Sequence, residues 1–248
     1  NLNSFYKISE NIKIEFIHIT HSVPQAALIA IHTDYGIILY ANDFKFDLYP
    51  VLGKKPNFKR LEELGKEGII ASVVESTYAS DARKMPSESV AREMLKDVLL
   101  GTDNKDNLII VTTFSSHIAR LKSIIEFGQK LNRKIIFLGR SLAKYVKAAE
   151  NIGIVDFSKD VEIVKYSRQI ERMLKKVDKD REKYLLIVTG HQGEPKSVLY
   201  KIAKGEFEFD LYPEDSVVFS CRTIPTPTNI ENRDALENEL KQTGVRIF

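Results

Sequence analysis

Two side chains that can bind metal ions follow strand-like stretches near the start of the chain. His21 comes after the apolar run at 11–19, and Asp43 follows a second apolar run at 36–41. Imidazole nitrogen and carboxylate oxygen are both ligands that Zn²⁺ accepts in proteins. The pair therefore indicates part of a metal site, although the sequence shows no obvious set of further ligands that would complete it.

Further chemistry-bearing residues gather where other strand-like runs end. These strand ends carry small, polar and ionisable residues, at 21–22, 42–43, 75–77, 113–117, 139–141, 190–193 and 220–222. Hydroxyls, backbone N–H groups and helix N-termini together form anion sites, so phosphate is the expected ligand. Ser115, Ser116 and His117 are expected to begin a helix, with their donors toward a phosphate. Phe114 could stack on a base or belong to the core, and the sequence leaves both open.

The elements that position these residues follow from the pattern of apolar side chains. Runs at 11–19, 26–33 and 36–41 predict strands, and the polar turn 34–36 predicts a hairpin between the last two. From residue 58 onward, amphipathic helical patterns alternate with apolar strand-like runs, and the chain ends on a further strand-like run at 244–248. Continuous apolar strands with crossover helices predict buried parallel strands. The fold class is therefore α/β: a sheet-rich layer over 1–74 and a doubly wound parallel sheet over 75–248. The charge-rich segment 156–183 reads as a surface excursion with a solvated helical face.

Composition limits the function classes. Cys221 is the only cysteine, which excludes an internal disulfide and a thiolate zinc cluster and favours a reducing, cytoplasmic setting. We expect it to be an inert buried thiol. No apolar run is long enough to predict a membrane span. The net charge of +3 permits an anionic partner without requiring one. The glycine fingerprints of dinucleotide and triphosphate sites are absent, which argues against a Rossmann-type nucleotide enzyme.

Taken in order, six motifs resemble one family. The stretches "THSVPQA", "DFKFD", "VESTYA", "TTFSSHIARL", "GRS" and "TGHQGEP" resemble those of ribonuclease J, of the β-CASP branch of the metallo-β-lactamase superfamily. The resemblance covers nearly the whole chain, and Gln25 is more similar to the archaeal form than to the bacterial one. It implies that 1–74 is the C-terminal portion of the first metallo-β-lactamase segment, part of an αββα sandwich, and that 75–248 is the β-CASP domain.

The resemblance also implies roles for the site residues. His21 would be a zinc ligand, and Asp43 would bridge two zinc ions and be catalytic, although Asn42 stands where the family usually has glycine. Glu75 matches the acidic residue of the first β-CASP motif and would be catalytic by orienting a metal-ligating histidine. His191 lies where the family has a small polar residue that lines the pocket for the 5′-monophosphate of RNA, and we expect His191, Gln192 and Gly193 to bind RNA or its phosphate. Lys45 and Asp47 could support the metal site or face a phosphate, but structural roles are favoured.

The activity implied is zinc-dependent hydrolysis of RNA phosphodiesters. The expected substrate is single-stranded RNA with a 5′-monophosphate, degraded 5′→3′, with an endonuclease mode and a homodimer of the intact protein left open. The chain lacks the family's His-x-His-x-Asp-His cluster and its two later histidine motifs. We therefore expect an internal piece of a longer enzyme that is inactive alone. The alternatives are a DNA-directed nuclease of the same branch and a non-catalytic nucleic-acid-binding module.

Overall fold

The computed structural model describes residues 4–248, which form two compact units, Asn1–Ala91 and Arg92–Phe248. The first three residues of the predicted 1–74 domain lie outside the described part. The units divide later in the chain than residue 74: the first unit includes the segment 75–87 and the first turn of the helix that begins at Glu88, up to Ala91. Each unit is described by itself below.

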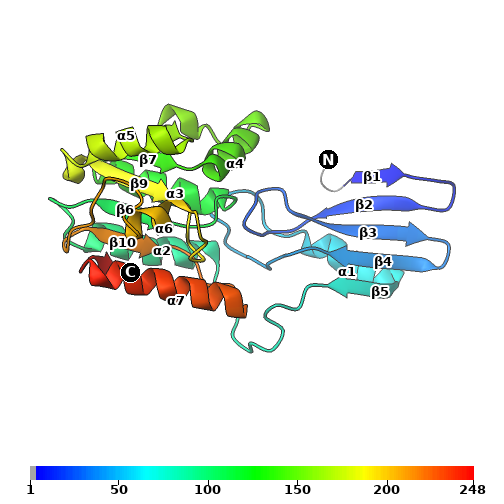
Figure 1. Ribbon diagram of the computed structural model, residues 1–248. Helices are drawn as coiled ribbons and strands as arrows, with labels where there is room; N and C mark the ends of the chain where they lie inside the picture. The colour runs from blue at the N-terminus through cyan, green and yellow to red at the C-terminus, as the bar shows by residue number, and fades with distance from the viewer. Residues whose placement is uncertain (1–3) are drawn as a thin grey trace. The chain divides into compact units, whose positions relative to one another are not determined.

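The first unit is built on a five-stranded sheet (Figure 1). Its strands, in spatial order, are β1 (Ser4–Lys7), β2 (Lys13–His18), β3 (Ala27–Thr33), β4 (Gly36–Ala41) and β5 (Ile69–Val74). Neighbours from β1 to β4 are antiparallel, and β4 and β5 are parallel. The hairpin between β3 and β4 is as predicted, whereas β1 was not. Since β2, β4 and β5 run in the same direction, the residues that follow them gather at one end of the sheet.

A small apolar core holds helix α1 (Phe58–Glu67) against this sheet. The buried residues are Ile17, Ile19, Leu28, Ala30, Ile37, Ala41 and Leu64. The side chain of Asn57 accepts a hydrogen bond from the Arg60 N–H and caps the start of α1. Gly68 ends it at a φ of 102°, a conformation that favours glycine. The helical pattern predicted from residue 58 onward is therefore confirmed here.

The second unit contains a six-stranded sheet in which every neighbouring pair is parallel. The spatial order is β11 (Arg246–Ile247), β10 (Ser216–Phe219), β6 (Ile109–Thr112), β9 (Tyr184–Val188), β7 (Lys134–Leu138) and β8 (Val161–Val164). From β6 the chain builds outward to β8, then returns to β9 and continues to the opposite edge. This is the predicted doubly wound topology, and it brings the carboxyl ends of all six strands to one edge.

Six helices accompany this sheet: α2 (Glu88–Gly101), α3 (Ile118–Lys130), α4 (Arg140–Asn151), α5 (Ser167–Val177), α6 (Val198–Ala203) and α7 (Pro227–Gln242). Helix α3 begins later than predicted, after the two serines, with His117 at its N-cap. Helix α7 begins at Pro227, because the Thr226 side chain accepts from the Asn229 N–H and proline suits the first helical turn.

The surface-excursion interpretation of 156–183 was wrong. This segment contains two short 3-10 helices, η1 (Phe157–Lys159) and η2 (Arg181–Lys183), the edge strand β8, and helix α5. Helix α5 buries Ile170, Met173, Leu174 and Val177 in the core of the unit. These apolar residues do recur at helical spacing, but the many charged residues between them obscured the pattern.

No helix in residues 4–248 is both long enough and apolar enough to span a membrane.

Candidate functional site

The loops that follow β2 and β4 are joined to each other by backbone and side-chain hydrogen bonds. Thr20 and Lys45 form an isolated antiparallel bridge, in which the Lys45 N–H donates to the Thr20 carbonyl at 2.7 Å. The Thr20 hydroxyl donates to the Lys45 carbonyl and accepts from the Asp47 N–H at 3.1 Å. Because His21 and Asp43 lie next to these bonded residues, the two predicted metal ligands are held at the same end of the sheet.

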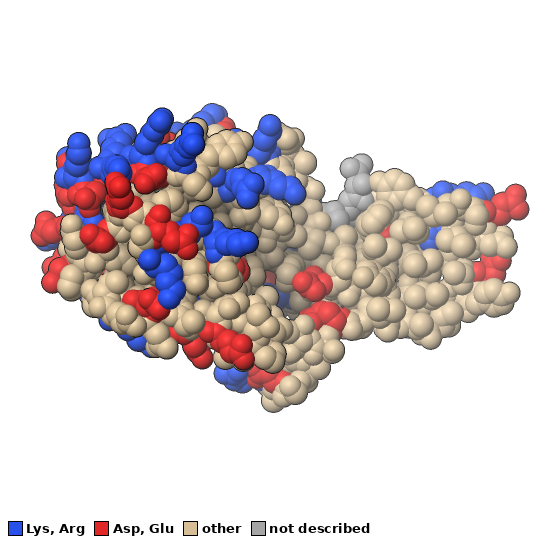
Figure 2. All heavy atoms as spheres, viewed as in Figure 1, with Lys and Arg blue, Asp and Glu red and all other residues tan. Residues whose placement is uncertain are grey.

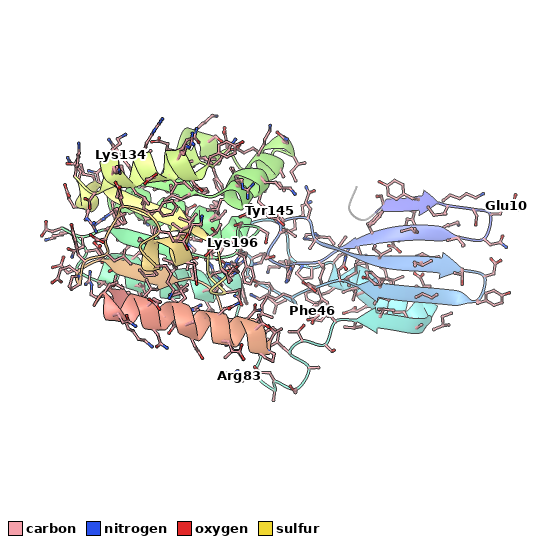
Figure 3. All side chains as sticks on the ribbon, in the orientation of Figure 1. Glu10, Phe46, Arg83, Lys134, Tyr145 and Lys196 are labelled. Carbon is pink, nitrogen blue, oxygen red and sulfur yellow. The ribbon has the colours of Figure 1, made fainter. Side chains whose placement is uncertain are left out.

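Aromatic rings pack together at the 43–47 loop, which follows β4. The ring centroid of Phe46, which is labelled in Figure 3, lies 5.1 Å from that of Phe44 and 5.5 Å from that of Phe58, the first residue of α1. Such tilted and edge-on contacts add to the apolar burial. The start of α1 therefore fixes the 43–47 loop that carries Asp43.

Asp47 at the end of the loop has a structural role. Its carboxylate is buried and accepts from the Ser87 hydroxyl at 2.5 Å, the Glu88 N–H at 2.7 Å and the Tyr49 N–H at 2.9 Å. Burial acts to raise the pKa of Asp47, but these hydrogen bonds and the nearby Lys45 outweigh it, so the pKa is lowered. The charged carboxylate thus caps α2 at its first residue and anchors the loop, as the structural interpretation favoured.

His21, Asp43 and Glu75 form an electrostatic cluster at this end of the sheet. Desolvation is the largest influence on the His21 imidazole and lowers its pKa, although the residue as a whole is exposed. The carboxylates of Asp43 and Glu75 act in the opposite direction, and Lys45 adds to the lowering. The net result is a neutral imidazole near pH 7, the form that can bind a metal ion.

The cluster does not make a complete metal centre. Among residues 4–248, no group of three or more histidine, cysteine, aspartate and glutamate side chains is placed to hold an ion. Glu75 accepts the Thr77 N–H at 2.8 Å, the largest cause of its lowered pKa, and His21 Nδ1 lies 3.2 Å from the Ser22 hydroxyl. The donors present therefore do not fit a zinc ion by themselves. The ligand roles of His21 and Asp43 and the orienting role of Glu75 stay predictions.

Two other histidines of this unit have structural partners. His32 Nε2 lies 2.9 Å from the Glu15 carboxylate, and His18 Nε2 lies 3.0 Å from the Lys54 carbonyl.

The second unit brings most of the predicted phosphate-binding residues to the carboxyl ends of its parallel strands. The Phe114 ring, after β6, lies 4.0 Å from the His191 ring, after β9. The Ser115 hydroxyl is 3.0 Å from the Ser141 hydroxyl at the start of α4. Ser116 and His117 complete the turn, with the His117 N–H bonded to the Phe114 carbonyl at 2.9 Å and the Ile118 N–H bonded to the Ser116 carbonyl at 2.9 Å. Residues far apart in the chain thus form one polar cluster in this unit.

His191 is the residue of this cluster most suited to meet a ligand. It is only 7% exposed, and its Nε2 has no hydrogen-bond partner among the described residues. Its Nδ1 lies 3.6 Å from the Glu194 carboxylate. Burial lowers the pKa of His191; Glu194 opposes this effect, and Arg233 adds to it. A buried neutral imidazole that carries its proton on Nε2 can donate a hydrogen bond to a bound oxyanion.

Gln192 and Gly193 stabilise the conformation of the loop that follows β9. The Gln192 side chain is already hydrogen-bonded within the protein. The Gln192 side chain donates to the Arg222 carbonyl at 3.0 Å and accepts from the Ile224 N–H at 2.7 Å. Gly193 has a φ of 74°, and a Cβ there would lie 2.2 Å from the Asn232 carbonyl oxygen. Glycine is needed because α7 approaches the loop so closely. Their predicted contact with phosphate stays a prediction.

Sequence reasoning missed two arginines that hold this cluster together. The Arg233 guanidinium lies 3.3 Å from the centre of the Phe219 ring and donates to the His191 carbonyl at 2.8 Å. Arg120 is buried and donates to the Ser220 carbonyl and, at 2.9 Å, to the Ser220 hydroxyl. Both come from helix interiors, where a charged residue gives no sequence signal of burial. Beside them, burial raises the pKa of the half-buried Cys221 to about 12, so the thiol stays protonated near neutral pH, and its inertness stays a prediction.

Comparison with known proteins shows which proteins the chain resembles. Residues 106–238 match the family described as "Ribonuclease J, beta-CASP domain". The chain is 45% identical over its whole length to ribonuclease J of Pyrococcus abyssi, covering 54% of that protein, and 44% identical to that of Methanocaldococcus jannaschii, covering 56%. A bacterial ribonuclease J, from Sinorhizobium meliloti, is 31% identical over 95% of the chain, and the chain covers 39% of that protein. The chain thus spans about half the length of the curated relatives it matches.

One solved structure has a similar fold. It is described as the crystal structure of a protein of unknown function from Enterococcus faecalis, with a TM-score of 0.59 and 15% identity, covering all of this chain and 53% of that one. This likeness concerns the fold alone.

Proposed function

This chain belongs to the ribonuclease J β-CASP family, and from that premise we propose that the gene product containing it hydrolyses RNA phosphodiesters in a zinc-dependent reaction. The archaeal relatives, more similar to it than the bacterial one above, agree with the resemblance that Gln25 indicated. The proposed substrate is single-stranded RNA with a 5′-monophosphate, shortened from its 5′ end, with internal cleavage as a second mode. We also propose a cytoplasmic site of action.

The observation that carries this proposal is the joining of the 20–22 and 43–47 loops through the Thr20–Lys45 bridge. It keeps a neutral imidazole and a carboxylate at one end of the sheet, where His21 and Asp43 are proposed to contribute two ligands to a zinc centre. Because the described residues include no group of three donors, the other ligands must come from other parts of the gene product. Bound zinc would supply Lewis-acid chemistry there.

The second cluster supports recognition of the RNA 5′ end. His191 offers one unsatisfied ring nitrogen beside the Phe114 ring, and the Ser115 hydroxyl lies nearby on the same turn. A hydrogen bond from a buried imidazole and from a hydroxyl can hold a terminal phosphate, and Phe114 can stack on the first base. This assigns the 5′-monophosphate to the second unit and phosphodiester hydrolysis to the first.

The test compares RNA substrates that differ only at the 5′ end. Purified gene product is incubated with single-stranded RNA carrying a 5′-monophosphate or a 5′-hydroxyl, and with DNA of the same sequence. The proposal expects mononucleotides released progressively from the monophosphorylated RNA, and much slower release from the 5′-hydroxyl RNA. Faster hydrolysis of the DNA would show a DNA-directed nuclease, and no hydrolysis of any substrate would favour a non-catalytic binding module.

Metal analysis provides a readout that does not depend on activity. Zinc content of the purified gene product is measured by mass spectrometry and compared between the unaltered protein and His21→Ala. The proposal expects two zinc ions per chain in the former and a clear loss of zinc in the latter. His32→Ala is the matched control, because His32 has a carboxylate partner within the sheet. Equal zinc content in all three proteins would contradict the ligand role of His21.

A further inference from the structure

Helix α5 carries a row of cations on the side opposite its buried residues. Arg168, Arg172 and Lys176 recur every four residues and are all exposed, whereas Ile170, Met173, Leu174 and Val177 face the core. Residues spaced by four lie on one face of a helix, about 6 Å apart along its axis. The row therefore presents three guanidinium and ammonium groups along about 12 Å of helix.

None of these three side chains has an ion-pair partner among the described residues. Other cations on the same segment are paired, including Lys175 with Glu208 and Lys183 with Asp180. Figure 2 shows Lys and Arg gathered over α5, at the top of the view. An exposed cation without a carboxylate partner is free to contact an anion from outside the chain.

The positive charge of the chain is concentrated in this region. Residues 140–183 contain 12 Lys and Arg against 8 Asp and Glu, a net charge of +4. The whole chain has 37 and 34, so the remaining residues contain 25 and 26, a net charge of −1. The excess that gives the chain its basic character therefore lies on and around α4 and α5.

An open groove of about 390 Å³ runs between α5 and the edge strand β8. Its walls include Arg172, Lys176 and Gln169, with Met173 beside them and Glu162 on the β8 side. At the start of α5, Tyr166 is 60% exposed. Cations along a groove, together with an exposed aromatic ring at the start of the same helix, are features by which proteins bind single-stranded nucleic acid through phosphate contacts and base stacking.

We propose that the outer face of α5, defined by Arg168, Arg172 and Lys176 with Tyr166 at its start, is a docking surface for the phosphate backbone of single-stranded RNA. It is separate from the strand-end cluster of Phe114, Ser115 and His191. It holds RNA through charge and stacking, so it is independent of base sequence. The inference rests on the proposed function for the identity of the nucleic acid and adds a second contact surface to it.

Salt dependence of binding provides the test. The gene product carrying Asp43→Asn, to prevent hydrolysis, is titrated with an oligouridylate of about 20 nucleotides and with one of about 4 nucleotides. Each phosphate neutralised on a single strand contributes about 0.7 to the slope of log affinity against log salt. Changing Arg168, Arg172 and Lys176 together to Gln should therefore reduce the slope for the long RNA by about 2, and Arg172→Gln alone by about 0.7.

A matched control separates local contacts from net charge. Lys59, Lys66 and Lys105 are exposed and have no ion-pair partner among the described residues. Changing these three to Gln removes the same charge and should leave the slope for the long RNA unaltered. The short RNA should bind all variants equally.

The outcomes distinguish this inference from the proposed function. If the α5 triple variant keeps the unaltered slope, or if the control triple lowers the slope equally, the α5 surface is not an RNA contact. Loss of binding to polyglutamate without loss of RNA binding would identify an acidic protein partner and overturn the inference. Hydrolysis is measured separately with protein that has unaltered Asp43. If this protein cleaves RNA but the α5 triple variant has an unaltered salt slope, the inference about α5 is contradicted and the proposed function is not. If the α5 triple variant lowers the salt slope but the protein with unaltered Asp43 cleaves no RNA, the proposed function is contradicted and the inference about α5 is not.

Discussion

Replacing Asp47 by asparagine removes the charge from the buried carboxylate that anchors the 43–47 loop. Asp47 is 3% exposed and accepts three hydrogen bonds from Ser87, Glu88 and Tyr49. Hydrogen bonds to a charged group contribute about 1.5–3 kcal/mol each, and losing a helix cap costs about 0.5–2 kcal/mol. Asparagine keeps the shape and one acceptor oxygen but turns an NH₂ group toward one of the three donors. We therefore expect Asp47→Asn to lower the free energy of unfolding by about 2–4 kcal/mol.

The assay is urea unfolding followed by far-UV circular dichroism and tyrosine fluorescence, since the chain has 10 Tyr and no Trp. Asp34→Asn is the matched control, because Asp34 is exposed in the turn between β3 and β4. Asp34→Asn should leave the unfolding midpoint unaltered, while Asp47→Asn lowers the midpoint of the transition that includes the first unit.

The pH dependence has a defined sign. The folded-state pKa of Asp47 lies below its unfolded value, so the carboxylate stabilises the protein fully above the unfolded value of about 3.9. That contribution is lost as the pH falls through the lowered folded-state pKa. The difference between the unaltered protein and Asp47→Asn should thus be constant near neutral pH and shrink in acid. Equal midpoints for Asp47→Asn and Asp34→Asn at neutral pH would refute the reasoning.

Two further predictions concern the strand-end cluster of the second unit. Gly193→Ala should destabilise the protein by about 2–4 kcal/mol, because its Cβ would meet the α7 backbone; Gly65→Ala, which meets nothing within 4 Å, should not destabilise it in the same thermal unfolding series. Cys221 should react with iodoacetamide at about pH 8 on the order of 10³-fold more slowly in the folded protein than in urea, because burial raises its pKa to about 12. Mass spectrometry follows the single thiol, and equal rates in both states would show that the thiol is not buried.

The sequence predicted the parallel sheet because its strands are continuous apolar runs, and the positions of the site residues followed from that topology. Phe114 and His191 could be assigned to one edge before their contact was known, since all strands of a parallel sheet end there. The bonding between the loops that carry His21 and Asp43 could not be predicted in the same way. It depends on the Thr20–Lys45 bridge, a pairing between loops that no periodic pattern encodes.

Other features could not be predicted from the sequence because charged side chains form hydrogen bonds with groups inside the second unit. Arg120 and Arg233 lie in helices and bond loop carbonyls, although arginine in a helix usually marks a solvated face. The surface-excursion interpretation of 156–183 was wrong for the opposite reason, although the solvated helical face predicted there is present. There the apolar stripe of α5 was present but surrounded by cations, and those cations now define the proposed RNA-docking surface.

The loss of hydrolysis on changing Asp43 tests the central claim most directly. Initial rates of nucleotide release from 5′-monophosphorylated single-stranded RNA are compared for the gene product carrying Asp43→Asn or Asp34→Asn. If Asp43 serves the hydrolytic site, its variant should lose at least about 100-fold in rate while RNA affinity and the unfolding midpoint stay unaltered. A rate for Asp43→Asn close to that of Asp34→Asn would contradict it.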